Sequence, residues 1–218
     1  MLVKDCMTRH PILITPTMRA AEAQKLMGEN NIRHLPVVGD GKRLVGLLTR
    51  ERLALKPDVL GSLNVWEISR YLAELSVEKV MLPARHVQTI DQERTVERAA
   101  HLMTEEKLGC LPVIEEGIVV GILTETDLLS SYQEMLGLPA EGVRVTMRMP
   151  DKEGEFTKLM KVIVDQKWGI MGIGTFPTPR LPGQYDMVLK IVNVTVDDVR
   201  ETLSGVPGQA MVDIRDVV

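Results

Sequence analysis

The feature that most constrains the fold of this chain is an internal repeat, marked by the tripeptide Leu-Pro-Val at residues 35–37 and again at 111–113. The longer segments around these tripeptides, 26–38 and 102–114, share six identical residues in thirteen. Self-similarity over this length is typical of a duplicated structural unit. The sequence therefore predicts two copies of one small fold.

The repeat extends beyond these segments in both directions. Residues 44–53 match 119–128 at five of ten positions, and both segments contain glycine, a hydrophobic residue, leucine and threonine in that order. Near the start of the chain, residues 3–7 resemble residues 77–81, since both begin with valine and end with methionine. The duplicated unit is therefore a whole small fold of about 50 to 60 residues.

The hydrophobic pattern predicts the same order of elements in each copy: strand, helix, strand, strand and helix. In the first copy we expect an extended stretch at 11–16, a helix that buries Ala20, Ala23 and Met27, and strands that end at Val38 and Thr49. In the second copy the corresponding features are the stretch 87–90, a helix that buries Val96, Ala99 and Met103, and strands that end at Ile114 and Thr124. One copy is too small to bury its apolar faces alone, so we expect the two copies to pack together.

The composition argues against several classes of function. With 218 residues, 44% hydrophobic content and a mean hydropathy near zero, the chain has the profile of a globular protein. Its net charge of -4 provides no basic surface for a nucleic acid. Cys6 and Cys110 lie far apart in the sequence, which favours a reduced, cytoplasmic compartment over a disulfide scaffold. We see no signal-peptide pattern and no run of roughly 18 apolar residues, so we expect no membrane span.

The last third of the chain has a different pattern. Residues 143–149 alternate strictly between apolar and polar, as a half-buried strand does. After this strand we expect a helix with Phe156, Leu159, Met160, Ile163 and Val164 on one face, strands at 170–176 and 185–194, a helix that begins at Thr195, and a strand at 210–217. This order is βαββαβ, which predicts a ferredoxin-like unit.

Thr124 and Asp127 are the residues that most suggest a binding site. They place a hydroxyl at the start of a predicted helix and a carboxylate three residues later. The N-terminus of a helix attracts phosphate, and an ionised Asp can accept hydrogen bonds from both hydroxyls of a ribose. The alternative is a capping box, in which Thr124 caps the helix and Asp127 bonds back to it. On spacing alone, both interpretations stay open.

The paired segments, the Leu-Pro-Val strand and the sequence Gly-hydrophobic-Leu-Thr-x-x-Asp together resemble a tandem pair of CBS domains. The resemblance covers residues 1 to about 135. It implies a first CBS domain at 1–60 and a second at 77–136. Between them, apolar residues recur at spacings of three or four, which predicts a connecting helix at 61–76. We expect Trp66 in this helix to be a packing anchor; the alternative is a platform for a ligand.

The resemblance implies that an adenine nucleotide, AMP, ADP or ATP, binds between the two CBS domains as a regulatory ligand. Its expected site combines the following residues of the two copies: Ile122, Thr124, Asp127, Ile12, Arg33 and Pro36. Asp127 would bind the ribose, the backbone of Ile12 would meet the adenine, and Arg33 would neutralise phosphate charge.

A second site, related to the first by the symmetry of the repeat, would include Thr49, Arg52, Gln88 and Pro112. Arg52 stands where the motif has Asp, and a cation cannot accept hydrogen bonds from ribose hydroxyls. We therefore expect this second site to be weaker, either empty or occupied by an anionic group.

Residues 140–218 resemble an ACT domain, and the order of the three domains resembles the acetoin-utilisation B (AcuB) family. The ACT resemblance implies an effector turn at Asp151 and Gly154 that binds an amino acid or another small effector; the alternative is a sheet that pairs only to form dimers. The expected fold class is thus α/β (α+β), a tandem CBS-domain pair followed by a ferredoxin-like ACT domain. The AcuB resemblance implies a link to acetoin utilisation.

We expect a non-catalytic regulatory homodimer that acts on an unknown protein target. No catalytic residues are assigned, because His34 has no nucleophile or orienting partner at a suitable spacing. No metal site is assigned, because the four histidines and two cysteines lack ligand spacing. The alternatives are a structural dimerisation module without a ligand and, as a weaker interpretation, an enzyme.

Overall fold

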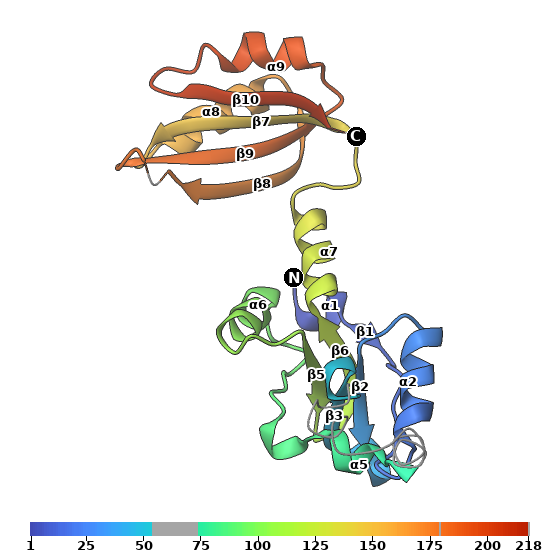
Figure 1. The fold of residues 1–218 in the computed structure, drawn as a ribbon. Helices are drawn as coiled ribbons and strands as arrows, with labels where there is room; N and C mark the ends of the chain where they lie inside the picture. The colour runs from blue at the N-terminus through green and yellow to red at the C-terminus, as the bar shows by residue number, and fades with distance from the viewer. Residues whose placement is uncertain (54–73, 179, 218) are drawn as a thin grey trace. The chain divides into compact units, whose positions relative to one another are not determined.

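The protein is described by a computed structural model that covers residues 1–53, 74–178 and 180–217. The chain divides into two compact units, Met1–Leu128 and Leu129–Val218 (Figure 1). The predicted connecting helix at 61–76, including Trp66, lies outside the described residues except for its last three positions.

The first unit contains the repeat, and the two copies fold alike. The first copy contains α2 (Ala20–Glu29), β2 (His34–Val38), the 3-10 turn η1 (Asp40–Lys42), β3 (Leu44–Thr49) and the 3-10 turn η2 (Arg50–Leu53). The second copy contains η3 (Ala84–His86), α6 (Val96–Glu105), β5 (Cys110–Glu115), β6 (Ile118–Thr124) and α7 (Glu125–Met135). The predicted order of helix, strand and strand is confirmed in both copies.

The extended stretches predicted at 11–16 and 87–90 are not regular strands. Each pairs through a single residue: Ile14 forms a parallel bridge with Val37, and Ile90 forms one with Val113. The N–H of Ile14 donates to the carbonyl of Pro36, and its own carbonyl accepts from Val38. The prediction of strands was wrong here because the chain turns immediately after each bridge, which leaves no residues to extend the ladder.

The leading segment of each copy crosses to the sheet of the other copy. The short helix α1 (Val3–Cys6) leads into β1 (Thr8–Arg9), and α5 (Val77–Val80) leads into β4 (Leu82–Pro83). β1 pairs antiparallel with β6 of the second copy, while β4 pairs antiparallel with β3 of the first copy. The two sheets therefore have the orders β1-β6-β5 and β2-β3-β4.

This crossing explains the glycine of the Gly-hydrophobic-Leu-Thr motif. A Cβ added at Gly121 would lie 2.5 Å from the Sδ of Met7, and one added at Gly46 would lie 2.5 Å from the Sδ of Met81. Each glycine thus leaves room for the methionine that ends the leading segment of the other copy. The repeated glycine and the repeated methionine are therefore the two partners of the same contact, which occurs once in each sheet.

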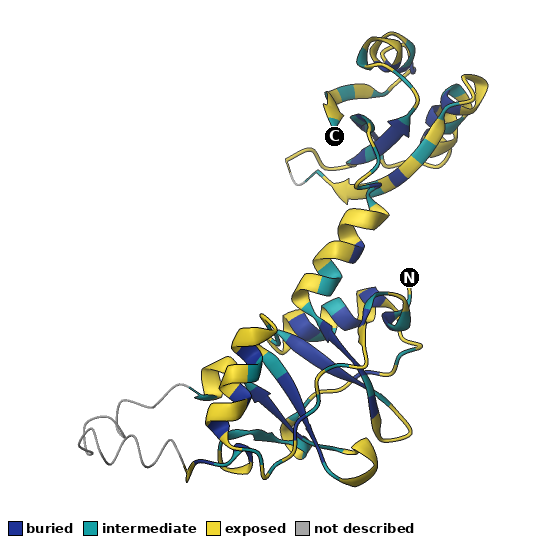
Figure 2. Ribbon diagram, turned by 90° about the vertical axis from the view of Figure 1, so that its right-hand side faces the viewer, coloured by how far each residue is buried: buried dark blue, intermediate teal, exposed yellow. Residues whose placement is uncertain are grey.

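The position of the strands also explains the Leu-Pro-Val motif. β2 and β5 are the outer strands of their sheets, where a missing N–H removes no ladder hydrogen bond that the sheet needs. Leu35, Val37, Leu111 and Val113 are fully buried, and the strands are the dark core of the first unit in Figure 2. Each proline is therefore tolerated in an outer strand, and the leucine and valine on either side of it are buried in the core.

The second unit has the predicted ferredoxin-like order, βαββαβ. Its elements are β7 (Gly142–Pro150), α8 (Glu155–Asp165), β8 (Gly169–Pro177), β9 (Gln184–Val192), α9 (Val196–Leu203) and β10 (Ala210–Val217). The strands form one antiparallel sheet with the order β10-β7-β9-β8. Alternate residues of β7 and β9 pack against α8 and α9, which confirms the alternation seen at 143–149. The predicted α+β fold class, with its repeated unit, is confirmed.

No helix among the described residues is both long and apolar enough to cross a membrane.

Candidate functional site

Thr124 and Asp127 form the capping box that the spacing allowed. Oδ2 of Asp127 accepts hydrogen bonds from the main-chain N–H of Thr124 and from its hydroxyl, both at 2.7 Å. The N–H of Asp127 in turn donates to the Thr124 hydroxyl at 3.4 Å. Both side chains are half-buried at the start of α7. The cap fixes the carboxylate in one orientation, so it does not compete with a binding role.

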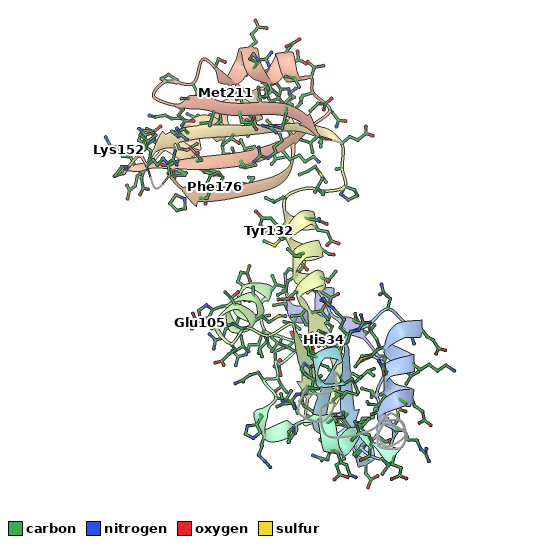
Figure 3. The ribbon with its side chains drawn as sticks, viewed as in Figure 1. His34, Glu105, Tyr132, Lys152, Phe176 and Met211 are labelled. Atoms are coloured by element: carbon green, nitrogen blue, oxygen red, sulfur yellow. The ribbon has the colours of Figure 1, made fainter. Side chains whose placement is uncertain are left out.

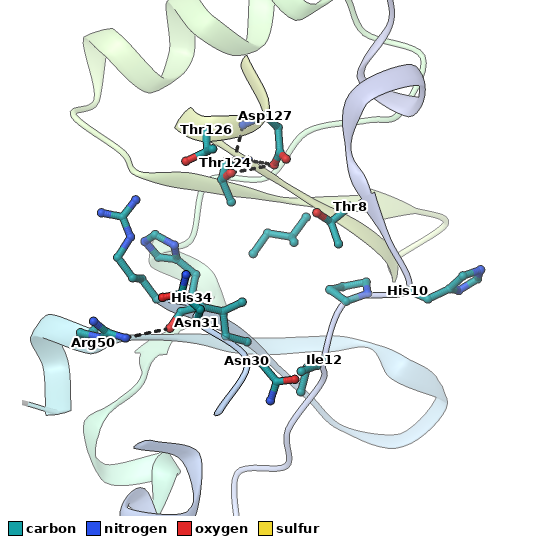
Figure 4. A pocket seen from close by; sticks show the side chains of 14 residues that line it. Thr8, His10, Ile12, Asn30, Asn31, His34, Arg50, Thr124, Thr126 and Asp127 are labelled. Atoms are coloured by element: carbon teal, nitrogen blue, oxygen red, sulfur yellow. Dashed lines mark hydrogen bonds between the residues drawn. The ribbon is translucent and has the colours of Figure 1, made fainter. Parts of the chain in front are cut away.

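A cavity of about 620 Å³ opens beside this cap (Figure 4). Its walls are the leading segment of the first copy, the turn after α2, and the junction between β6 and α7. The lining residues are Thr8, His10, Pro11, Ile12, Asn30, Asn31, Ile32, Arg33, His34, Arg50, Ile122, Thr124, Thr126 and Asp127. The cavity therefore joins residues of both copies.

Five of the residues expected at the first site line this cavity: Ile12, Arg33, Ile122, Thr124 and Asp127. Pro36 is not among its lining residues. It is buried in β2, where its carbonyl accepts the hydrogen bond from Ile14. The structure thus places Pro36 in the support of the site.

The cavity is lined by more positive than negative side chains. Arg33 and Arg50 line it and are both exposed, whereas Asp127 is the carboxylate in its lining. A guanidinium group of Arg50 donates to the carbonyl of Ile32 at 3.4 Å, which holds it beside the turn after α2. Figure 4 shows Thr124 and Asp127 on one side of the cavity, and Ile12 and Asn30 on the other. A ligand with an anionic end and a hydroxyl-bearing middle matches this distribution.

His34 is half-buried in the wall and packs close to the second copy. A Cβ added at Gly109 would lie 3.2 Å from the Nε2 of His34, so the imidazole covers this glycine. Burial lowers the pKa of His34, and the charge of Arg33 lowers it further, against the opposite effect of Glu51 and Glu125. The imidazole is therefore more readily neutral than an exposed one.

Several lining residues were not predicted from the sequence: Thr8, His10, Pro11, Asn30, Asn31, Ile32, His34, Arg50 and Thr126. Asn31 has φ of 52°, and its counterpart in the second copy, Lys107, has φ of 53°. Both follow the end of a helix, where a left-handed residue is common. Asn30 and Asn31 are typical of the end of a helix, and this signal could have located the turn. The position of Arg50 in the cavity lining depends on how the strands pack, which the local sequence does not reveal.

The four residues expected at the second, symmetry-related site lie on different segments. Thr49 ends β3, Pro112 is buried in β5, and Gln88 lines a separate cavity of about 550 Å³ with Arg94 and Arg98. Arg52 donates to the carbonyl of Val80 at 3.4 Å. The residues that follow Leu53, next to Arg52, lie outside the described part of the chain.

The turn expected to bind an effector lies at one end of the second unit's sheet. Gly154 has φ of 87° and precedes α8, a left-handed position that favours glycine. Asp151 lines a cavity of about 470 Å³ together with Lys152, Phe156, Thr175, Phe176, Pro177, Gln184, Tyr185 and Met187. Figure 3 shows Lys152 and Phe176 near the same end of this sheet. Gly154 itself is not among the lining residues.

Comparison with curated proteins finds relatives that match about three fifths of the chain. An L-aspartate semialdehyde sulfurtransferase of Methanocaldococcus jannaschii is 30% identical over 130 residues, which are 58% of this chain and 22% of that protein. The chain spans less than half the length of the curated relatives it matches.

Two solved structures resemble the same region. An acetoin utilization protein (AcuB) from Vibrio cholerae is 30% identical, with a TM-score of 0.53 over 63% of this chain and 94% of that one. CBSX2 of Arabidopsis thaliana, solved in complex with AMP, is 25% identical, with a TM-score of 0.50 over 60% of this chain and 95% of that one.

The two copies of the repeat also match a known domain family. Residues 3–56 and 77–134 each match the sequence profile described as the CBS domain. These ranges contain both Leu-Pro-Val strands, both glycine motifs and the Thr124–Asp127 cap. The chain belongs to the CBS-domain family and carries a tandem pair of these domains.

Proposed function

We propose that the cavity beside Thr124 and Asp127 binds an adenine nucleotide, and that the protein is a non-catalytic regulator. The observation that carries this proposal is the position of the Asp127 carboxylate. Its cap orients it at the edge of a cavity that also presents Arg33 and Arg50. A fixed acceptor beside two cations suits a ribose attached to phosphate.

The remaining walls fit the other parts of a nucleotide. Ile12 and Ile122 provide apolar surface from the two copies, against which an adenine ring can lie. Thr124 and Thr126 stand at the start of α7, where main-chain N–H groups and the helix dipole attract phosphate. Because two arginines line the cavity, we expect ADP and ATP to bind more tightly than adenosine.

The known proteins support this assignment. CBS pairs are regulatory modules, and CBSX2, which shares the fold of the first unit, was solved with AMP. The sulfurtransferase relative is an enzyme by name, but the matched residues are 22% of that protein. The regulatory assignment therefore rests on the part of the relatives that this chain shares.

The test is a binding panel on the full chain. Purified protein would be titrated calorimetrically with adenosine, AMP, ADP, ATP and S-adenosylmethionine, and thermal shifts would be recorded for the same compounds. Binding to the native state raises the melting temperature in proportion to affinity and concentration. Failure of every compound to bind would overturn the proposal and favour a structural dimerisation module. Turnover of a bound compound would favour an enzyme.

For the second unit we propose an ACT-like effector site at the cavity of about 470 Å³. The chain has only seven aromatic residues, and three of them, Phe156, Phe176 and Tyr185, line this cavity. Asp151 and Lys152 supply one charge of each sign beside these rings, as a zwitterionic amino acid requires. An amino-acid panel in the same thermal-shift assay tests this site, and Asp151→Ala with Phe176→Ala should abolish any response.

We also propose that the protein is a homodimer. β8 is an outer strand of its sheet and exposes Met171, Ile173 and Phe176. Exposed apolar edges promote association unless they are paired or covered. Sedimentation should show a dimer that Ile173→Lys weakens, and a monomeric wild-type protein would contradict the proposal.

The proposed setting is the cytoplasm, with a protein target connected to acetoin utilisation. Similarity to the Vibrio cholerae acetoin utilization protein supports this link. A strain that lacks the protein should grow more slowly with acetoin as carbon source, and unchanged growth would remove the link.

A further inference from the structure

Lys190 of β9 is a buried cation without a partner in the described part of the chain. Its neighbours Leu189 and Ile191 pack against the helices, so Lys190 points to the opposite face of the sheet. The residue is 3% exposed, and its Nζ atom is buried with no hydrogen-bond partner among the described residues. Buried polar groups are almost always paired, and an unpaired buried charge is strongly unfavourable.

The segment that joins α7 to β7 covers this lysine. A Cβ added at Gly137 would lie 3.1 Å from the Cδ of Lys190. A Cβ added at Gly172 of β8 would lie 2.4 Å from the carbonyl carbon of Leu136. The main chain of Leu136 and Gly137 therefore rests directly on β8 and β9, over the lysine.

The acidic groups on this face are already used by other cations. Asp213 accepts from Arg144 at 2.9 Å and from Arg215. The second carboxylate of the face, Asp186, is bound by both ends of the Arg148 guanidinium. Arg144 is also the β7 residue in register with Lys190. Among the described residues, these two carboxylates bind three arginines, and Lys190 has no carboxylate partner.

We propose that Lys190 is an anion-binding centre that takes the carboxylate of a small organic acid. The acid enters when Leu136 and Gly137 move away from β8, and its carboxylate binds the ammonium group beside Arg144. The apolar side chains of Leu136 and Met171 then contact the body of the acid.

A carboxylate fits this position better than a phosphate does. The two anions already on this face are carboxylates bound to guanidinium groups, which shows that the spacing of the cations suits that group. One ammonium group, with Arg144 engaged by Asp213, matches a single negative charge. The site is distinct from the cavity at Tyr185, because five residues of a strand separate Tyr185 and Lys190 by roughly 16 Å.

The binding of an acid at Lys190 would move Leu136 and Gly137, which cover the lysine. Leu136 and Gly137 follow α7, whose first turn carries Asp127. Movement of this segment changes the end of α7 and the start of β7 together. Acid binding at Lys190 would therefore change the segment that follows α7 within the second unit.

The experiment compares sodium acetate and disodium succinate with sodium chloride at equal ionic strength, using the full chain. Thermal shift and calorimetry would be recorded for the wild type, for Lys190→Met and for the matched control Lys161→Met, an exposed lysine of α8. We expect at least one acid to raise the melting temperature of the wild type and of the control. Lys190→Met should melt higher than the wild type without ligand and should bind the acid at least roughly tenfold more weakly, about 1.4 kcal/mol.

Hydrogen exchange of the wild type provides a second readout that needs no variant. We expect the amides of residues 136–141 to change their exchange rate when the acid is added. Equal acid binding by the wild type and Lys190→Met, or no response of the wild type to either acid, would overturn the proposal. Stabilisation that depends on protein concentration and accompanies dimerisation would assign the carboxylate to a second copy of the chain and would also overturn it.

Discussion

Oδ2 of Asp127 accepts hydrogen bonds from the main chain and from the hydroxyl of Thr124, and Asp198 makes the same two bonds with Thr195. The two capping boxes have the same sequence spacing, and the first lines the cavity that also presents Arg33 and Arg50. Asp198 is exposed at the start of α9. Substitution of Asp127 and of Asp198 should therefore affect stability alike, whereas only the substitution of Asp127 should affect ligand binding.

Asp127→Ala should weaken adenine-nucleotide binding, whereas Asp198→Ala should leave it unchanged. Loss of hydrogen bonds to a charged group weakens binding roughly tenfold to a hundredfold. Both variants keep the capping threonine and lose the carboxylate that completes the capping box, so both should melt at a slightly lower temperature. Calorimetric titration with AMP and ATP measures the binding, and equal affinities of the two variants would contradict the assignment of Asp127.

Arg52→Ala should leave the nucleotide affinity of the first site largely intact. Arg52 bonds the carbonyl of Val80 and does not line the cavity beside Asp127. Titration of this variant beside Asp127→Ala gives a direct comparison of the two copies. Equal losses in both variants would show that the asymmetry between the copies has been misassigned.

Gly121→Ala should destabilise the first unit. The new Cβ would meet the Sδ of Met7 at 2.5 Å and the carbonyl oxygen of Thr8 at 3.1 Å, and such overpacking costs about 1–3 kcal/mol. Gly28→Ala is the control, since nothing lies within 4 Å of its Cβ position in α2, and a helical alanine gains about 0.5–1 kcal/mol. Urea unfolding measures both, and a neutral Gly121→Ala would disprove the close contact.

Cys110 should be inert to thiol reagents in the native protein. Burial raises the pKa of the Cys110 thiol to about 12, and the charges of Glu51 and Glu125 act in the same direction. Because the unfolded thiol ionises near pH 9, this group's contribution to stability is complete below pH 9 and is lost as the pH rises toward 12. Iodoacetamide at pH 8, followed by mass spectrometry, should label Cys110 only after denaturation, and rapid native labelling would contradict this.

Nucleotide binding should take up protons below pH 6.5. The pKa of His34 lies below its usual value of 6.5, so the folded protein without ligand binds this proton more weakly than the unfolded chain does. Stability should therefore fall as the pH drops through this range. A phosphate beside the imidazole favours protonation and reverses the shift.

Titration in buffers of different ionisation enthalpy measures this proton uptake. His34→Gln should remove both the uptake and the loss of stability at acidic pH. The same uptake in this variant would assign the proton to another group.

Most of the architecture could be predicted because its signals are local. Alternation in 143–149 and the glycine motifs specify strands and turns within a few residues, and the confirmed elements β7, β3 and β6 match them. The stretches 11–16 and 87–90 were the exception. Their apolar residues indicate a strand, but the number of ladder partners depends on where the chain turns away.

The candidate site could be predicted only in part for the same reason. Thr124 and Asp127 lie in one motif, so their closeness to each other could be predicted from their spacing. Arg50 and His34 belong to the other copy and reach the cavity through the packing of two sheets, which no sequence window contains. Pro36 was expected in the lining because the resemblance to CBS pairs implied it, yet it is buried in β2 and its carbonyl accepts the hydrogen bond from Ile14.

The crossing of the leading segments sets the order in which the protein can be completed during synthesis. β1 emerges from the ribosome first but pairs with β6, whose Gly121 and Ile122 are made more than a hundred residues later. The first seven residues therefore wait, with Val3 and Met7 exposed, until the second copy has been made. Neither copy can finish its sheet alone, so the cavity between them forms only in the last stage of folding of the first unit.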